Sequence, residues 1–253
     1  MKKDCHKQLI ELLKELHLPM FREYYQEFAQ KAIRDELGYE DYLCELAVRE
    51  CEVRRANKIA RLVKASKLPL EKTLQTFDLK RLPVKLRRQL EVLLDGTFVS
   101  RRENILAFGK PGSGKTHLLC AVCHELARQG KRVYFATCDL MVQELLRAKQ
   151  ELKLDKWLKK LSQYETLMID DFGYVKQNRE EMEVLFTLLA YRYERGSVLI
   201  TSNLPFSKWE QIFKDPMTTA AAIDRLVHHS VILELNVPSY RAEEAQKRKT
   251  VDI

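Results

Sequence analysis

Residues 109–116 read Gly-Lys-Pro-Gly-Ser-Gly-Lys-Thr, which matches the phosphate-binding loop pattern G-x-x-x-x-G-K-[ST] at every fixed position. Three of the chain's eight glycines fall within its first six positions. A loop that wraps a triphosphate brings backbone N–H groups within hydrogen-bonding distance of the phosphate oxygens, and Cβ atoms would block that approach. The octapeptide therefore predicts a fold in which a buried strand leads into the loop and a helix leaves it.

The flanking segments supply that setting. Residues 104–108 form a short apolar run, and residues 115–129 have helical periodicity that ends at Gly130. Lys115 is expected to hold the β- and γ-phosphates, and the Thr116 hydroxyl to be a Mg²⁺ ligand. The loop residues expected to bind the nucleotide are Gly109, Lys110, Pro111, Gly112, Ser113, Gly114, Lys115 and Thr116.

Downstream of the loop, apolar strands alternate with helical segments. The helical segments cover 115–129, about 139–162, 180–195 and 204–228, and the strands cover 104–108, 132–138, 165–171, 197–202 and 231–237. This alternation predicts an α/β fold with a central parallel five-stranded sheet flanked by helices. Phosphate chemistry is then expected at the carboxyl ends of the strands.

Two acids end the apolar segment Leu-Met-Ile-Asp-Asp at residues 167–171. Acids at the end of a buried strand need a cation to neutralise them, although a strand followed by a polar turn is a common alternative. Asp170 is expected to hold Mg²⁺ through water, and Asp171 to orient or deprotonate the attacking water.

Further polar residues lie beside the last two strands. Asn203 ends the segment Val-Leu-Ile-Thr-Ser-Asn and can hydrogen-bond the γ-phosphate or the lytic water. Arg225 and Arg241 flank the last strand. Single arginines are usually surface residues, so the pattern alone leaves their role open.

Residues 7–66 have helical patterns, with Pro19 marking a turn, and predict a helical domain over 1–70 before a nucleotide-binding domain over 71–253. Residues 76–78 and 81–83 are expected to form an entry linker into the nucleotide-binding domain. Between Arg49 and Arg102 there are fifteen Lys or Arg residues against six acids, a local charge of +9 in a chain whose net charge is +8. Such an excess favours a polyanionic partner, most commonly nucleic acid, although a solvated helix face is the alternative.

Composition excludes several other classes of protein. No apolar run approaches the ~18–20 residues of a membrane span, and the first residues lack a signal peptide, so we expect a cytoplasmic protein without a membrane partner. Cys120-x-x-Cys123 lies within a predicted helix, with no second ligand pair at zinc spacing. All six cysteines are therefore expected to be reduced and mostly buried, and the pair His228-His229 to be structural.

The order of these motifs, followed by Asp-Arg-Leu at 224–226 and Ser-Tyr-Arg at 239–241, resembles the AAA+ ATPases over about residues 77–241. It is most similar to the branch that holds the DnaC-type helicase loaders and the IstB-like transposition helpers. Residues 68–78, Leu-Pro-Leu-Glu-Lys-Thr-Leu-Gln-Thr-Phe-Asp, resemble the IstB-like proteins in particular. Those proteins serve two-gene insertion sequences beside a transposase.

The resemblance implies roles that the spacing does not show. Asn203 would be sensor 1, Arg225 an arginine finger acting on ATP held by a neighbouring subunit, and Arg241 a sensor 2 residue that contacts the γ-phosphate. ATP would then drive assembly of a ring or spiral of identical subunits. Most AAA+ proteins carry Glu in place of Asp171, so slow turnover is expected, and the chain is too short after Arg241 for a C-terminal lid.

The resemblance further implies an ATPase that assembles on duplex DNA largely without sequence preference, assists a transposase and disassembles on hydrolysis. Residues 147–160 carry six Lys or Arg against two acids, together with Trp157, and are expected to contact DNA phosphates along one helix, unless they are a solvated amphipathic face. The amino-terminal helices would bind the partner or DNA. The alternatives are a DnaC-like helicase loader, a small-molecule kinase and a nucleotide-dependent adaptor without catalysis.

Overall fold

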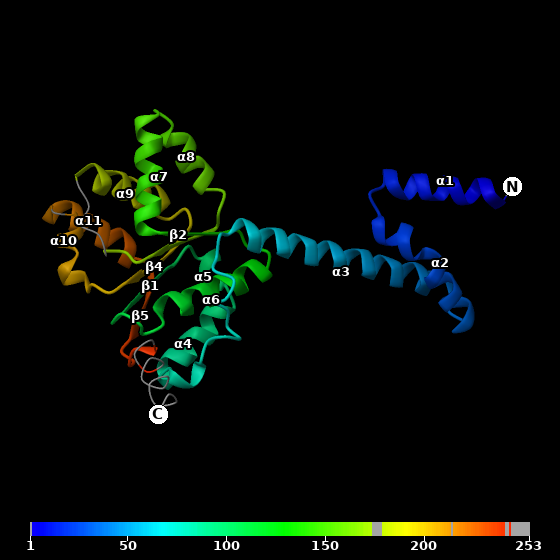
Figure 1. The fold of residues 1–253 in the computed structure, drawn as a ribbon, viewed down its shortest axis with the longest axis horizontal. Helices are drawn as coiled ribbons and strands as arrows, with labels where there is room; N and C mark the ends of the chain where they lie inside the picture. The colour runs from blue at the N-terminus through cyan, green and yellow to red at the C-terminus, as the bar shows by residue number, and fades with distance from the viewer. Residues whose placement is uncertain (1, 174–178, 214, 241–242, 244–253) are drawn as a thin grey trace, which may run out of the picture. The chain divides into compact units, whose positions relative to one another are not determined.

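The computed structural model of the chain describes residues 2–173, 179–213, 215–240 and 243 (Figure 1). Contacts divide it into two units, Met1–Arg61 and Leu62–Ile253. This division comes earlier in the chain than the boundary predicted at residue 70. The predicted absence of a carboxyl-terminal lid concerns the residues after Arg241, of which the structure describes only Glu243, so it stays a prediction.

The amino-terminal unit is helical, as predicted, and consists of α1 (Lys2–Glu15), α2 (Pro19–Arg34) and most of α3 (Tyr39–Ala65). Pro19 occupies the first position of α2, where its missing N–H costs no hydrogen bond. The buried Glu50 of α3 accepts a hydrogen bond from the Met20 backbone N–H at 2.8 Å and one from Arg54 Nε at 2.7 Å. A carboxylate at the start of α2 complements the helix dipole, so Glu50 fastens α2 to α3.

The second unit begins with short helical elements before the sheet. They are η1 (Leu79–Arg81), α4 (Val84–Leu94) and α5 (Thr97–Ser100). The Asp78 side chain caps η1 by accepting a hydrogen bond from the Lys80 backbone N–H at 3.0 Å. Leu86, Leu90 and Leu93 bury one face of α4.

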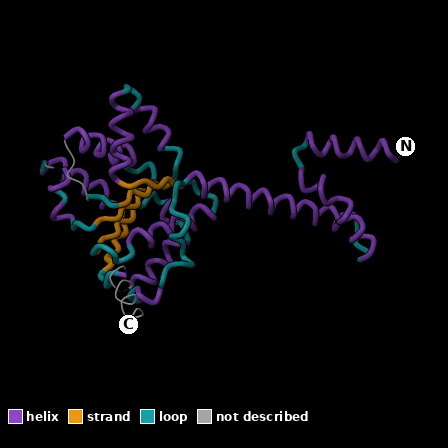
Figure 2. The backbone as a smooth tube through the Cα atoms, in the orientation of Figure 1, coloured by secondary structure: helices purple, strands orange, loops and turns teal. Residues whose placement is uncertain are grey.

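The sheet has five parallel strands in the order β2-β3-β4-β1-β5, which confirms the predicted topology class. Figure 2 shows the strands in orange, with helices on either side of them. The observed bounds lie within two residues of those predicted from the sequence. The strands are β1 (Asn104–Gly109), β2 (Val133–Thr137), β3 (Thr166–Asp170), β4 (Ser197–Ser202) and β5 (Ser230–Leu235).

Helices cover both faces of the sheet (Figure 1). Because successive side chains of a strand point to opposite faces, Ile105 and Leu199 pack in the core beneath α4 and α6, while Leu106 and Ile200 pack in the other core. The first face is covered by α4 and α6 (Lys115–Arg128). The second face is covered by α7 (Cys138–Gln150), α8 (Leu154–Leu161), α9 (Arg179–Arg192) and α11 (Pro216–Val227). The short elements η2 (Phe206–Lys208) and α10 (Glu210–Phe213) precede α11 in the chain.

The prediction that residues 147–160 follow one helix is wrong. Helix α7 ends at Gln150, Leu152 adopts a left-handed conformation with φ of 54°, and α8 begins at Leu154. The Lys153 N–H donates to the Ala148 carbonyl at 2.7 Å and the Leu152 N–H to that of Lys149 at 3.0 Å, which closes the end of α7. The basic side chains of this segment therefore lie on two helices.

The cysteines divide evenly between surface and core. Cys120, Cys123 and Cys138 are buried, whereas Cys5, Cys44 and Cys51 are exposed, and none of the six forms a disulfide. The expected reduced state stays a prediction, and the expected burial holds for only half of the cysteines. Within the described residues, no helix has the length and apolar character needed to cross a membrane.

We expect three thiols of the native protein to react rapidly with a thiol reagent at pH 8, and all six to react after denaturation. Burial raises the pKa of Cys120 to about 12 and that of Cys123 well above its ordinary value, so neither forms the reactive thiolate. The substitution Cys44→Ser should lower the rapid count to two. More than three rapidly reacting thiols in the native protein would contradict the buried positions.

Candidate nucleotide-binding site

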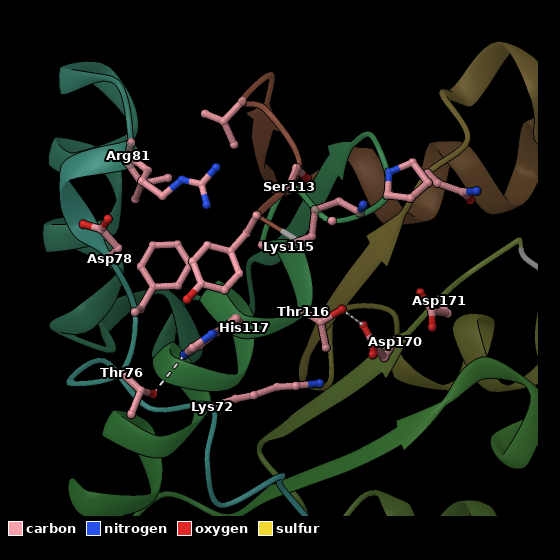
Figure 3. A pocket seen from close by; sticks show the side chains of 18 residues that line it. Lys72, Thr76, Asp78, Arg81, Ser113, Lys115, Thr116, His117, Asp170 and Asp171 are labelled. Carbon is pink, nitrogen blue, oxygen red and sulfur yellow. Dashed lines mark hydrogen bonds between the residues drawn. The ribbon is translucent and has the colours of Figure 1, made fainter. Parts of the chain in front are cut away.

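The phosphate-binding loop joins the end of β1 to the start of α6 (Figure 3). Gly112 and Gly114 adopt left-handed conformations with φ of 78° and 93°. A Cβ at Gly112 would overlap Ser239 Oγ, and one at Gly114 would lie 3.2 Å from Phe77 Cε2. Both positions therefore require glycine for conformation and for space.

Lys115, which the sequence predicts to contact phosphate, is the first residue of α6. Its side chain is 8% exposed, and Nζ donates to the carbonyls of Gly109 at 2.8 Å and Lys110 at 3.0 Å. These two hydrogen bonds hold the ammonium group against the backbone of the phosphate-binding loop. Backbone N–H groups at the start of the helix add their own attraction for an anion.

A buried carboxylate lies where β3 ends. Asp170 is 5% exposed, and its Oδ1 accepts hydrogen bonds from Thr116 Oγ1 at 2.8 Å and from Thr201 Oγ1 at 2.5 Å. The predicted pair Thr116 and Asp170 is therefore brought together from α6 and β3, as Figure 3 shows. Hydroxyl and carboxylate oxygens are ligands that suit Mg²⁺, so this donor set fits the ion.

Asp171 lies beside this pair in an uncommon backbone conformation. Its φ is 57°, and its N–H donates to Thr201 Oγ1 at 2.9 Å. Asp and Asn tolerate the left-handed region better than longer side chains because their short polar groups bond locally. This conformation gives a physical reason for Asp at a position where the AAA+ pattern usually carries Glu.

Asn203 follows β4 and faces the same space. Its Oδ1 is buried and has no hydrogen-bond partner within the described part of the chain, and the same is true of Ser113 Oγ. Buried polar atoms are nearly always hydrogen-bonded in native proteins. Their position beside the phosphate loop therefore indicates a polar ligand.

These groups line one cavity of about 520 Å³. It brings together six of the eight predicted loop residues, 111–116, with Asp170, Asp171 and Asn203. Gly109 and Lys110 contribute the carbonyls that hold Lys115. Sequence reasoning missed the other residues that line the cavity, which are Lys72, Thr76, Phe77, Asp78, Arg81, Leu82, His117, Val237 and Tyr240.

Aromatic and imidazole rings form the wall of the cavity on the side away from Asp170 and Asp171 (Figure 3). Phe77 and His117 pack edge to face with centroids 5.1 Å apart, and the Arg81 guanidinium lies 5.1 Å from the centroid of the Tyr240 ring. Burial lowers the pKa of His117, while its Nε2 lies 3.0 Å from the Thr73 carbonyl oxygen. A wall of this kind suits the base of a nucleotide. The only sequence signal for it is an aromatic residue within the predicted linker.

Of the two predicted arginines, only Arg225 lies within the described residues, and it is not in this cavity. Arg225 lies on α11, donates from Nη1 to the Ala221 carbonyl at 3.0 Å and lies 5.0 Å from the centroid of the Phe186 ring. It is not among the residues that line the cavity. Arg241 lies outside the described residues.

The pair His228-His229 is remote from the nucleotide cavity, because it precedes β5 whereas the phosphate loop follows β1. Both side chains are exposed, and the Tyr193 hydroxyl lies 3.0 Å from His228 Nδ1. Their donor atoms and a carboxylate oxygen of Glu194 lie within 4.8 Å of one another. The structural role expected for these histidines stays a prediction.

The fold and this cavity define a P-loop ATPase of the AAA+ class. The crystal structure of the DnaC helicase loader is similar, with a TM-score of 0.55 and 22% identity over 65% of this chain and 97% of that chain. AMPPCP-bound DnaA from Aquifex aeolicus gives a TM-score of 0.57 and 17% identity over 74% of this chain and 57% of that chain. At such identities the likeness concerns the fold.

The chain belongs to the IstB-like ATP binding protein family, whose family model matches residues 11–249. It is 38% identical over 94% of its length to an insertion-sequence ATP-binding protein of Sinorhizobium fredii, of which it covers 80%. It is 39% identical over 90% of its length to one of Geobacillus stearothermophilus, of which it covers 91%. The predicted resemblance is confirmed.

Phe77→Ala should weaken ADP binding about 10-fold, since stacking of a base on an aromatic ring contributes about 1–3 kcal/mol. Titration with a fluorescent ADP analogue measures this change. Val84→Ala removes an exposed apolar side chain of α4 outside the cavity and should leave ADP affinity unchanged. Equal affinities for both variants would show that Phe77 does not contact the base.

Proposed function

We propose that this ATPase binds ATP with Mg²⁺, assembles on duplex DNA largely without sequence preference, and assists a transposase in insertion-sequence transposition. Hydrolysis then releases the assembly. The proposal is supported first by the position of Lys115, Thr116 and Asp170, which come together at the carboxyl ends of the strands. It is supported further by relatives that are insertion-sequence ATP-binding proteins. A cytoplasmic location, where such DNA is found, is part of the proposal.

Each residue of the cavity has a defined task in this proposal. The loop amides and Lys115 bind the phosphates, and Thr116 and Asp170 hold Mg²⁺, which neutralises charge on the phosphate oxygens when it is bound. Asp171 orients the attacking water and accepts its proton, and the Asn203 amide holds that water or the γ-phosphate. The buried, unpartnered Oδ1 of Asn203 can accept a hydrogen bond from the water, whereas a bond to the γ-phosphate would be donated by the amide NH2 group.

Arg225 completes the site of a neighbouring subunit as the arginine finger. Its place outside the cavity of its own chain, together with a half-buried guanidinium on α11, supports a role in trans. Arg241 acts as sensor 2. Sites shared between subunits make assembly of a ring or spiral depend on the bound nucleotide, because each clamp needs two chains.

Helix α8 is the element that we propose for contact with DNA phosphates. Arg147, Lys149 and Lys153 form ion pairs with acids, which reduces their availability. Lys156, Lys159 and Lys160 of α8 are exposed and form no ion pair within the described residues. Lysines of this kind contact the DNA backbone without reading sequence. The amino-terminal helices bind the transposase or further DNA.

A DnaC-like helicase loader is the second candidate, because the fold resembles that loader. Three relatives at 36–39% identity are insertion-sequence proteins, which favours the transposition role. The type of DNA that is bound separates the two candidates.

Sedimentation with fluorescent DNA tests the proposed function. In ATP, the protein should form a large complex on duplex DNA, and ADP or the absence of nucleotide should leave most of the DNA free. A single-stranded DNA of equal length is the control. Preference for the single strand would favour the helicase loader, and a protein that ignores both DNAs would contradict both candidates.

Arg225→Ala should lower ATP turnover about 1,000-fold, the lower range for removal of an arginine finger, while ATP binding is kept. Mixing it with Lys115→Ala, which keeps Arg225, should restore part of the turnover if the guanidinium acts between subunits. Arg195→Ala removes an exposed arginine of the same unit and should have no effect. Unchanged turnover in Arg225→Ala would refute the finger role.

A further inference from the structure

The hydroxyl of Thr201, on β4, bonds to both acids that follow the apolar segment of β3. Thr201 is 0% exposed. Its Oγ1 donates to Asp170 Oδ1 at 2.5 Å and accepts the Asp171 backbone N–H at 2.9 Å. One oxygen atom therefore connects the proposed Mg²⁺-binding carboxylate to the backbone of the proposed water-activating residue.

Thr201 also extends the pairing of the two strands into the turn after β3. The last paired residues of β3 and β4 are Ile169 and Ile200. Beyond them, the Thr201 side chain accepts the Asp171 N–H, and the Thr201 carbonyl accepts the Phe172 N–H at 2.8 Å. Two successive N–H groups of the turn are thus bound by one residue, which fixes the left-handed conformation of Asp171.

Few side chains can make these two bonds together. The position requires one atom that donates a hydrogen bond and accepts another, and a hydroxyl does both. The β-branch of Thr limits its rotamers and so holds the hydroxyl in place. Serine keeps the hydroxyl with more rotational freedom, and valine keeps the shape without it.

We propose that Thr201 is a positioning residue that sets the two acids of the ATPase site relative to each other. It turns the Asp170 carboxylate so that Oδ1 meets the Thr116 hydroxyl, and it holds Asp171 at the cavity. This inference rests on the proposed roles of Asp170 and Asp171. The side-chain hydrogen bonds of Thr201 go to Asp170 and Asp171 and not to the phosphate-binding loop. Phosphate binding in the absence of metal therefore does not depend on Thr201.

The test compares Thr201→Val with Thr201→Ser and measures nucleotide binding as well as turnover. Binding of a fluorescent, non-hydrolysable ATP analogue is titrated with Mg²⁺ and measured again in EDTA. In Thr201→Val, the Mg²⁺ concentration for half-maximal binding should rise about 10-fold, as for loss of other groups that orient metal ligands. Binding in EDTA should stay within about twofold of the wild-type value, because Lys115 and the loop remain intact.

Turnover provides the second measurement. Thr201→Val should lower kcat about 10- to 100-fold, the range for misplaced metal-site and general-base groups, with KM changed less than about threefold. Thr201→Ser should stay within about threefold of wild type in every measurement, since the hydroxyl is kept.

Ser202→Ala is the matched control. Ser202 is equally buried, and its hydroxyl donates to the Phe172 carbonyl at 2.7 Å without contact to either acid. Its loss should lower thermal stability but leave the Mg²⁺ requirement unchanged. A loss of stability alone therefore does not imitate the expected effect. If Thr201→Val fails to fold, Thr201→Ala provides the same comparison with less crowding.

Two results would overturn the inference. One is a folded valine or alanine variant with wild-type Mg²⁺ requirement and kcat, and the other is a serine variant as defective as valine, which would show that keeping the hydroxyl does not keep the function. The proposed function fails separately, if the wild-type protein neither hydrolyses ATP nor requires Mg²⁺ for tight binding. Wild-type hydrolysis with an unaffected valine variant would refute only the role of Thr201.

Discussion

The buried carboxylate of Asp170 is the constraint on which the arrangement of the site depends. A negative charge at the end of an apolar strand is costly unless hydrogen bonds and a cation compensate it. Here the compensation comes from Thr116 at the start of α6 and Thr201 at the end of β4. The helix after the phosphate loop and two neighbouring strands are therefore tied together at a single oxygen atom, and the rest of the cavity is built around that point.

The cavity is closed by segments that are distant from the loop in sequence. Phe77 and Arg81 come from the segment before the sheet, and Tyr240 comes from the segment after β5. The Tyr240 N–H donates to the Gly112 carbonyl at 3.0 Å, so the chain after β5 is bonded directly to the phosphate loop. Because residues of both segments line the cavity, a nucleotide bound there would lie against the chain before the sheet and the chain after β5.

The sequence predicted the sheet, the loop and the acids because phosphate chemistry demands particular residues at fixed spacing and buried parallel strands are apolar runs. It did not predict the break at Leu152, since neither Gly nor Pro marks it and the left-handed turn is held by backbone bonds. It missed Phe77 and Arg81 because no local pattern brings a linker against the loop. The burial of cysteines was overestimated because the amino-terminal helices leave Cys44 and Cys51 exposed.

The residues that follow α3 determine where the chain can be truncated without exposing the sheet. β2 is an edge strand, and its Phe135 N–H donates to the Ser66 carbonyl at 2.8 Å, while Lys67 lies 4.9 Å from the centroid of the Tyr134 ring. Ser66 and Leu68 are both buried. Residues that follow a long helix therefore protect the open edge of the sheet from pairing with other chains. A truncated protein that starts at residue 71 would expose this edge and tend to aggregate, whereas one that starts at residue 62 would keep its cover.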